Sequence, residues 1–492
     1  MKKFLILLPL LVLASCGKQR PAAVINIYHT AGAGGIFWSR QVPAFDNRYT
    51  GGYAVLKNFL NSQPGKKIVL DGGDWFSQTP EGAVARAAFP LKIMKNIGYD
   101  AAGISFEDVN PGWPALYEDI INSGMTVISS NVQNKSGKTP ARVQNFLIKD
   151  LGGVKAGVFS LIIKEDVTAP AARLGDIEIT DEADAAQAAV SALKSKGADI
   201  IILLVDAGGE TDFYWKKILD AADGIDVLLT TAGQRQAAGM EKYGNAYVVK
   251  TAPFLTQASK LRLLFDNNKK ITGAHFEAFP LFTDVYGEDE DLKQQTAAVR
   301  QSAYKKLNRV VAKTDGEINN VADGPGYLGE LAAGCIKEWA KADFAVINSD
   351  SLRSAPAGKI TEYSLYEIYP YADSVMIVRV RGEEIKNILE ASLASKNNFP
   401  QISGLKIDYD AAAPDGQKIK KILINGAPPA AQNIYRMAVT DHIMAGGFGT
   451  DEFINAVEFK NTNVDVRAIL RQCFSKKKTL TPAPPSSWKQ TS

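Results

Sequence analysis

This 492-residue chain has few histidines, few cysteines and a small net charge. It has three histidines, His29, His275 and His442, so few imidazoles are available as metal ligands. The net charge at pH 7 is only +3, which excludes the strongly basic surface expected of a nucleic-acid-binding protein. Beyond the N-terminus the cysteines are Cys335 and Cys473. We expect them to be free buried thiols, with a disulfide in an oxidising compartment as the alternative.

An apolar segment long enough to span a membrane is also missing. The apolar run 4–13 follows two lysines and ends in LASC, which predicts a signal peptide over residues 1–15. This ending resembles a bacterial lipobox and implies a lipid on Cys16, a membrane anchor, with residues 16–23 as the lipidated linker. The alternative is an ordinary signal peptide with an incidental cysteine. A lipoprotein would lie in the cell envelope, facing the periplasm or the exterior, and Gly17 favours the outer membrane.

Residues 24–285 alternate between short apolar runs and segments with helical spacing of apolar residues. Runs such as VINIY and ADIIILLVDAGG are typical of buried strands, and the segments between them are typical of helices. Such alternation predicts a layered α/β domain in which helices cover both faces of a sheet. The strands expected at 246–250, 260–266 and 271–279 should pair antiparallel and complete this domain.

The rest of the chain divides into a connector, a second unit and a tail. Residues 286–311 are polar, with acidic residues first and basic residues later, which suits a helix that links two domains. An ordinary surface helix is the alternative. Residues 312–475 form a second, smaller α/β unit. The tail 476–492 is basic and rich in proline and serine, so we expect it to be extended or disordered.

The segment KKIVLDGGDWFSQTPEG, residues 66–82, carries a candidate site residue. Its apolar run predicts a buried parallel strand, and two glycines and Asp74 follow directly. In open α/β sheets, ligands bind just beyond the carboxyl ends of the strands. The glycines let the backbone turn sharply and approach a ligand closely. We therefore predict that Asp74 lies at the functional edge of the sheet.

Several motifs of both halves match one known family. In the first half, NIYHTAGAGGIFW, LDGGDWFSQTPEG, YDAAGISFEDVNP, ISSNV and IDVLLTTAGQ occur in the family's order. In the second half, PGYLGELAAGCIKEWAKADFAVIN, GKITEYSLYEIYPYADSVMIVRVRGEEIKNILEASL, FPQISGLKIDYD and YRMAVTDHIMAGGFG match. Residues 24–475 thereby resemble the 5′-nucleotidase family. The resemblance implies a four-layer, calcineurin-like metallophosphoesterase domain joined by a helix to a smaller α/β domain that holds the nucleoside.

The same resemblance implies a reaction with two divalent metals bridged by an aspartate. Asp74 matches the bridging aspartate. The Asp-x-His motif after the first strand matches Gly32 and Gly34, which offer no side chain to a metal. Phe106 stands where an asparagine ligand is expected, and Ala232 replaces a histidine ligand.

Other matched positions carry different polar groups. The family's transition-state histidine matches Glu107, and the aspartate that orients it matches Asn110. A further histidine ligand matches Asp206, and Gln234 matches a tolerated glutamine. Asp74, Asp206 and Gln234, with Glu107 or Asp108, would form an oxygen-only set for one Mg²⁺, Ca²⁺ or Mn²⁺ ion. The alternative is a group of polar residues at strand ends that binds no cation.

The nucleoside-binding motifs of the second half are altered less. Asn348 and Arg353 match the ends of the family's Asn-x-Gly-x-x-Arg loop, in which arginine binds an anionic oxygen as a planar fork. Phe399 matches an aromatic residue that stacks on the base. In the Gly-Gly-Asp-Gly loop the aspartate has become Phe448. This residue either forms the second aromatic wall or packs in the core.

Together the motifs predict an envelope lipoprotein that has lost the dimetal phosphohydrolase site. It would bind a nucleotide or another small ligand, or act as a scaffold, without a cofactor and without nucleic acid. An active nucleotide or phosphoester hydrolase of nucleotide catabolism, with a remodelled site for one divalent cation, is the alternative. A third hypothesis is a subunit of a complex whose protein partner the sequence does not name.

Overall fold

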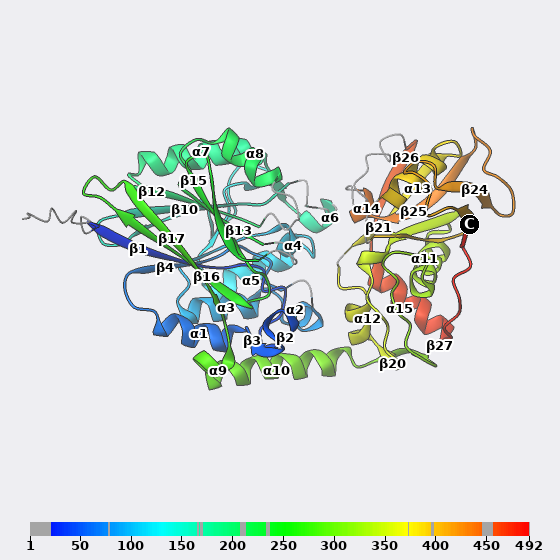
Figure 1. Cartoon of the computed structure of the whole chain (residues 1–492), viewed down its shortest axis with the longest axis horizontal. Coiled ribbons are helices and arrows are strands. Elements are labelled where there is room, and N and C mark those ends of the chain that lie inside the picture. The colour runs from blue at the N-terminus through cyan, green and yellow to red at the C-terminus, as the bar shows by residue number, and fades with distance from the viewer. Residues whose placement is uncertain are drawn as a thin grey trace, which may run out of the picture.

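The computed structural model describes residues 21–76, 79–164, 167, 171–206, 213–232, 237–371, 373–394, 398–444 and 456–491. They form two lobes, and the long helix α10 (Glu290–Leu307) runs along one side from the first lobe to the second (Figure 1). The predicted signal peptide and Cys16 lie outside the described residues. Within the described ranges, no helix is long and apolar enough to cross a membrane.

The first lobe contains two large sheets packed face to face. In spatial order, one has β17 (Ile271–Pro280), β16 (Gln257–Phe265), β1 (Ala23–Thr30), β4 (Lys67–Asp71), β5 (Ala101–Gly103), β6 (Val127–Ile128) and β8 (Val143–Gln144). The other has β14 (Gly239–Tyr243), β15 (Ala246–Thr251), β13 (Val227–Thr231), β12 (Ile200–Val205), β10 (Lys155–Leu161) and β9 (Phe146–Asp150). One apolar cluster lies between them, with Ile27, Leu70 and Ile202 fully or almost fully buried.

Helices cover the outer face of each sheet. On the seven-stranded sheet these are α1 (Tyr53–Ser62), α2 (Pro80–Ala85), α3 (Ala88–Ile97), α4 (Phe106–Val109) and α5 (Trp113–Ser123), which share a second cluster with the sheet. On the six-stranded sheet α7 (Glu182–Ser195) and α8 (Phe213–Ala221) share a third. The four-layer architecture predicted from the sequence is confirmed. Short elements complete the lobe: β2 (Arg40–Val42), β3 (Arg48–Thr50), β7 (Val132–Asn134), β11 (Ile177–Ile179), α6 (Ala171–Leu174) and α9 (Thr283–Tyr286).

Strand direction in the two sheets follows the expectation with one exception. Strands β1, β4, β5, β6 and β8 are parallel, and β16 and β17 are antiparallel, as predicted. The strand expected at 246–250 is β15, which runs parallel to β13 and pairs antiparallel only with the edge strand β14. The parallel strands bring their carboxyl ends to common edges, where Thr30 lies beside Asp71.

Helix α10 begins four residues later than the predicted connector at 286, because Asp289 caps it by accepting a hydrogen bond from the Leu292 N–H at 3.0 Å. Its Leu292 and Ala303 are buried against the first lobe. The helix is therefore packed on the first lobe over much of its length and is not a solvated spacer.

The second lobe is built on the sheet β22 (Pro400–Ser403), β19 (Phe344–Asn348), β25 (Ile434–Thr440), β21 (Ser374–Arg381) and β26 (Glu458–Asp465). Its helices are α11 (Tyr327–Ala340), α12 (Glu362–Ile368), α13 (Glu384–Ala394), α14 (Asp441–Met444) and α15 (Val466–Lys477). Two small sheets join it, β20 (Gly358–Thr361), β18 (Val310–Thr314) and β27 (Thr479–Leu480), and β24 (Ile419–Ile424), β23 (Leu405–Tyr409) and β28 (Trp488–Gln490).

For the second lobe, the expectation of free thiols is wrong, and the tail takes the first of its two expected forms, extended and not disordered. Cys335 of α11 and Cys473 of α15 form a disulfide with their Cα atoms 5.7 Å apart, because the two helices pack side by side. The tail is ordered, since β27 pairs with β18 and β28 pairs with β23. Trp488 is 7% exposed and its Nε1 donates to the Pro400 carbonyl at 3.1 Å. A single large aromatic side chain therefore anchors a segment whose composition is typical of disorder.

Candidate functional site

The candidate site of the first lobe lies at the carboxyl ends of β1 and β4. The loops that follow these strands run side by side, with the Gly32 N–H donating to the Gly73 carbonyl at 3.2 Å and the Gly34 N–H to the Asp74 carbonyl at 2.8 Å. Gly73 has φ +110°, and a Cβ there would lie 2.6 Å from the Ser105 nitrogen. Only glycine fits this close approach, as the sequence pattern predicted.

Asp74 lies next to Gly32 at this edge. Its side chain is almost completely buried, at 4% exposure, and its backbone adopts φ +54°. Gly32 has φ +54°, and a Cβ added to it would lie 3.2 Å from Oδ2 of Asp74. The structure thus brings together the positions that match the bridging aspartate and the first ligand of the family, and one of them has no side chain.

Asp108 holds the Asp74 turn in place. Its carboxylate accepts hydrogen bonds from the backbone N–H groups of Asp74 and Trp75, each at 2.8 Å, and of Ser105 at 3.1 Å. Burial raises the pKa of Asp108 to about 6, although these hydrogen bonds act in the opposite direction. The signal for this role is the Ser-x-x-Asp pattern that starts α4, because Ser105 and Asp108 form its capping box.

Asp71 is a second buried carboxylate that the sequence reasoning missed. It accepts hydrogen bonds from Thr30 Oγ1 at 2.5 Å, the Gly73 N–H at 3.0 Å and Trp75 Nε1 at 3.0 Å. Burial raises its pKa to about 7. Asp71 is the last residue of an apolar strand, so the sequence offers only its position as a signal.

The remaining matched positions of the first lobe are spread around this edge. Phe106 is half-buried against the apolar cluster, and Ala232, just after β13, is 1% exposed. Asp206, just after β12, is 5% exposed. Glu107 and Asn110 lie in and just after α4, both half-buried. Gln234 lies outside the described residues.

His29 is the histidine nearest to this edge, one residue before the end of β1. It is 1% exposed, and its Nδ1 lies 2.7 Å from Oγ1 of Thr251. Burial lowers its pKa to about 3, so its imidazole is neutral at physiological pH. In the described part of the chain, no group of three or more histidine, cysteine, aspartate and glutamate side chains is arranged to hold a metal ion.

In the second lobe, Asn348 and Arg353 frame one loop. Asn348 ends β19 and is fully buried, with its amide donating to Asp350 and its Oδ1 accepting from Ser351 Oγ at 2.8 Å. Arg353 donates from Nη1 to the Asp350 carbonyl at 2.6 Å and from Nη2 to the Tyr371 hydroxyl at 3.2 Å. The loop that replaces the family's glycines is therefore closed by its own polar side chains.

The aromatic residue beside Arg353 is Tyr371, which the sequence analysis did not single out. The guanidinium of Arg353 lies 5.9 Å from the Tyr371 ring. Phe399 is 9% exposed and packs against Trp488, at 5.0 Å between ring centroids, in the core of the lobe. Phe448 lies outside the described residues. Sequence reasoning missed Tyr371 because nothing distinguishes it from its neighbours until the fold places it.

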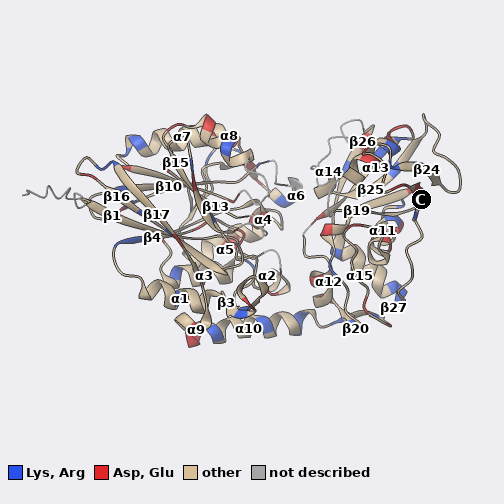
Figure 2. Cartoon of the chain, viewed as in Figure 1, with Lys and Arg blue, Asp and Glu red and all other residues tan. Residues whose placement is uncertain are grey.

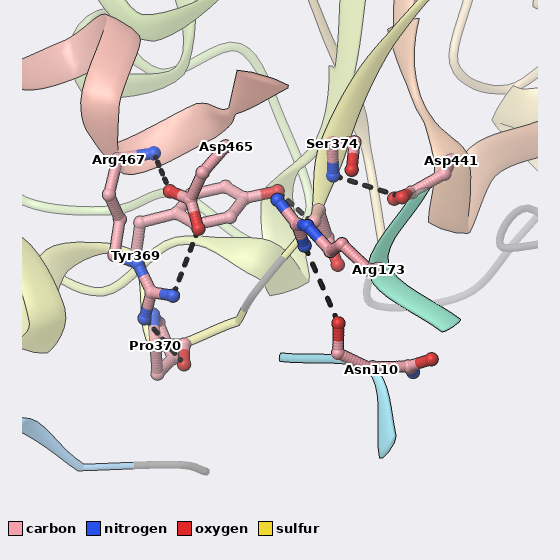
Figure 3. Close-up of polar contacts among 9 residues, drawn as sticks. Asn110, Arg173, Tyr369, Pro370, Ser374, Asp441, Asp465 and Arg467 are labelled. Carbon is pink, nitrogen blue, oxygen red and sulfur yellow. Dashed lines mark hydrogen bonds and ion pairs between the residues drawn. The ribbon is translucent and has the colours of Figure 1, made fainter. Parts of the chain in front are cut away.

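Several ionisable groups of the second lobe face the first lobe. Arg173 of the first lobe lines one cavity with Tyr366 and Arg467 of the second, and Figure 3 shows it in the same view as Tyr369 and Asp441. Burial, followed by the charge of Asp373, raises the pKa of Asp441 to about 7. Burial also raises the pKa of Tyr371, with a smaller contribution from the charge of Glu107 across the interface. The matched site positions of both lobes therefore face the same interdomain space.

Comparison with known proteins supports this arrangement. Residues 306–455 match the family model described as the 5′-nucleotidase C-terminal domain. A 5′-nucleotidase of Vibrio cholerae is 23% identical over 89% of this chain and 88% of its own length. An apyrase of Aedes aegypti is 24% identical over 75% of this chain and 72% of its own length.

Solved structures share the fold over nearly the whole chain. A 5′-nucleotidase precursor of Thermus thermophilus superposes with a TM-score of 0.72 at 18% identity, over 95% of this chain and 99% of its own. The sulfate thiohydrolase SoxB of Thermus thermophilus gives a TM-score of 0.65 at 14% identity, over 95% and 96%. At these identities the likeness shows the two-domain architecture. The matched model, the relatives and this architecture together show that the chain belongs to the 5′-nucleotidase family.

Proposed function

We propose that this member of the 5′-nucleotidase family has lost dimetal phosphoester hydrolysis and binds a nucleotide or a similar small ligand at the cell envelope. The observation that carries the proposal is Gly32, which lies against the Asp74 carboxylate, where a Cβ would be only 3.2 Å from Oδ2. A two-metal site needs side-chain ligands from this loop, and glycine supplies none.

The donor set around Asp74 does not fit two metal ions. Gly34, the second matched position of the same loop, also lacks a side chain, and Phe106 is packed against the apolar cluster. Asp108 and Asp71, which lie close by, already accept hydrogen bonds from backbone N–H groups. These carboxylates hold the turn, so we assign no hydrolytic step to them.

Ligand binding is supported by the polar groups of the second lobe. Arg353 has a planar guanidinium, which suits a phosphate or carboxylate oxygen, and Tyr371 lies beside it with a ring able to stack. Both lie on the face that looks toward the first lobe. A nucleotide fits this combination of a cation and an aromatic ring.

One observation favours the alternative hydrolase. Asp74 and Asp206 are both almost fully buried at strand ends, at 4% and 5% exposure, and oxygen ligands suit one hard divalent cation. Elemental analysis of the purified mature protein distinguishes the two functions. We expect less than one bound metal per chain, and no hydrolysis of AMP or bis(4-nitrophenyl) phosphate above background with Mn²⁺ or Mg²⁺. Hydrolysis that disappears in Asp74→Asn overturns the proposal.

Binding is tested separately by calorimetry with AMP in the absence of metal. We expect Arg353→Ala to weaken AMP binding at least tenfold, because it removes the guanidinium. The control variant, Arg379→Ala, removes an exposed arginine of β21 that pairs with Glu458 of β26, and it should leave AMP binding unchanged. Absence of AMP binding to the wild type overturns the nucleotide part of the proposal.

The envelope location rests on the LASC sequence and its cysteine. We propose that Cys16 carries lipid and that only a short segment separates it from β1, which starts at Ala23. Metabolic labelling with a tagged fatty acid should mark the wild type and not Cys16→Ser, and the variant should leave the membrane fraction. Membrane retention of an unlabelled Cys16→Ser variant contradicts the lipid anchor.

A further inference from the structure

A cavity of about 270 Å³ lies between the two lobes, beside the strand-end site and separate from the Arg353 loop. Its charged lining comes from both lobes. Arg86, Asp119 and Arg173 belong to the first, and Asp465 and Arg467 belong to the second. Figure 3 shows Arg173 and Asn110 facing Arg467 and Asp465 across this space, and Figure 2 shows charges of both signs on each lobe.

Arg86 is held in a fixed orientation on the first lobe. Its Nε donates to Asp119 Oδ2 at 3.0 Å, and its Nη2 donates to the Ala115 carbonyl at 2.6 Å and to Glu118 at 3.2 Å. Nη1 of Arg86 takes part in none of these bonds. Because α5 fixes the guanidinium, its remaining N–H donors are already placed for a ligand without loss of side-chain freedom.

Arg467 is fixed in a similar way on the second lobe. Its Nη2 donates to Asp465 Oδ2 at 3.1 Å and its Nη1 to the Pro370 carbonyl at 3.4 Å. The guanidinium lies 4.4 Å from the centre of the Tyr366 ring. Nε of Arg467 takes part in neither hydrogen bond. Each lobe therefore presents one oriented guanidinium to the same cavity.

Apolar groups form the other walls. Phe76 and Leu116 are 7% and 2% exposed, and Pro111, Ala115 and the Tyr366 ring line the cavity beside them. The volume lies just below the roughly 300–1,000 Å³ of typical small-molecule sites, so the cavity suits a ligand smaller than a nucleotide. Three arginines against two aspartates leave a net positive lining.

We propose that this cavity is a second binding site, which takes a small organic anion with an apolar or aromatic body. The carboxylate or phosphate-type head group binds between Arg86 and Arg467, and the apolar body lies against Phe76, Leu116 and Tyr366. Paired guanidinium groups are well suited to such planar or tetrahedral oxyanions. Because the two arginines come from different lobes, the bound anion also holds the lobes in this relative position.

The proposal is tested on the mature chain by calorimetry with benzoate and phenylphosphonate. Neither probe can be hydrolysed as a phosphate ester, so the outcome does not depend on whether the protein is a hydrolase. We expect at least one of the two to bind, and we expect inorganic phosphate and benzyl alcohol to bind at least tenfold more weakly. The difference between benzoate and phenylphosphonate identifies the preferred head group.

Variants locate the site. Arg467→Gln and Arg86→Gln should each weaken binding of the better probe at least tenfold, and Arg467→Lys should recover part of the loss. The matched control is Arg471→Gln, which lies four residues further along α15 and pairs with Glu362 on the surface. It should leave binding unchanged. Thermal unfolding of each unliganded variant establishes that it is folded.

Three outcomes overturn the proposal. The first is that neither probe binds at concentrations up to about 10 mM. The second is that Arg467→Gln binds the better probe as tightly as the wild type does. The third is that Arg353→Ala abolishes binding of the probe while Arg467→Gln leaves it unchanged. The last outcome assigns the anion to the Arg353 loop. AMP binding in the Arg467→Gln variant is measured in parallel, and its retention separates this cavity from the proposed nucleotide site.

Discussion

The two lobes hold their site regions by different means. In the first lobe, the turn that carries Asp74 is fixed by buried carboxylates, chiefly Asp108 and Asp71, which accept backbone N–H groups. In the second lobe, the frame is fixed by the disulfide between α11 and α15 and by the C-terminal strands. Its Asp465, near the interface, lines one cavity with Arg173 of the other lobe (Figure 3).

This difference teaches how a turn at a strand end can keep its shape through hydrogen bonds within its own lobe. Backbone donors at the Asp74 turn are satisfied by side chains of the same lobe, so the turn needs no ion to neutralise or orient it. Three changes test this comparison, in order of decreasing effect.

The largest effect should come from removing the disulfide. The double variant Cys335→Ala, Cys473→Ala opens a covalent link across 138 positions and should destabilise the second lobe by about 4 kcal/mol, because the unfolded chain regains entropy. Thermal unfolding followed by circular dichroism checks this, with the reduced wild type as the control. A variant that melts within 1 °C of the oxidised wild type contradicts the idea that the bond fixes this lobe.

A smaller effect is expected from Asp108→Ala in the first lobe. The change leaves the buried N–H groups of Asp74, Trp75 and Ser105 without their acceptor and should cost about 3 kcal/mol. Urea unfolding monitored by tryptophan fluorescence measures the loss. The control is Asp181→Ala, which removes an exposed cap of α7 that also binds two backbone N–H groups and should cost about 1 kcal/mol. If Asp108→Ala and Asp181→Ala lose the same free energy of unfolding, the burial of Asp108 does not increase its contribution to stability.

The smallest effect, taken as the change over a single pH unit, concerns pH. The folded pKa of Asp71, about 7, lies above its unfolded value of 3.8, so the folded state binds this proton more tightly. Stability should therefore fall as pH rises from about 4 to about 7, by up to about 1.4 kcal/mol per pH unit. Asp71→Asn should flatten this part of the profile, because the amide cannot ionise and its oxygen still accepts from Gly73 and Trp75. The test is to measure the free energy of unfolding of the wild type and of Asp71→Asn at pH 5, 6, 7 and 8. If both proteins lose stability with pH at the same rate, Asp71 is not the group responsible.

Much of the architecture could be read from the chain. The apolar runs of β4 and β12 predicted buried parallel strands, and the acidic-to-basic polarity of 286–311 predicted the connecting helix that α10 provides. The sequence left the tail as either extended or disordered, because its composition is that of disordered segments. Leu480 and Trp488 are buried, at 1% and 7% exposure, and composition averages over such single residues.

The site was predicted less completely. The sequence placed Asp74 and the glycines at one edge because a strand end fixes where its next residues lie. It did not identify Asp71 or Tyr371 as neighbours of the matched positions, and it named Asp108 only as a possible oxygen ligand of a cation. Their roles depend on contacts between residues far apart in the chain, such as Tyr371 with Arg353 and Thr30 with Asp71.

By itself, the sequence determined the alternation of strands and helices, the edge at which Asp74 lies, and the replacement of ligand side chains by Gly32 and Gly34, because these are properties of local pattern and residue type. Only the tertiary structure decided that Cys335 meets Cys473, that Trp488 fills the core beside Phe399, and that Arg86 and Arg467 face one cavity. The physical reason is that each of these contacts joins segments brought together by packing, which no local pattern records.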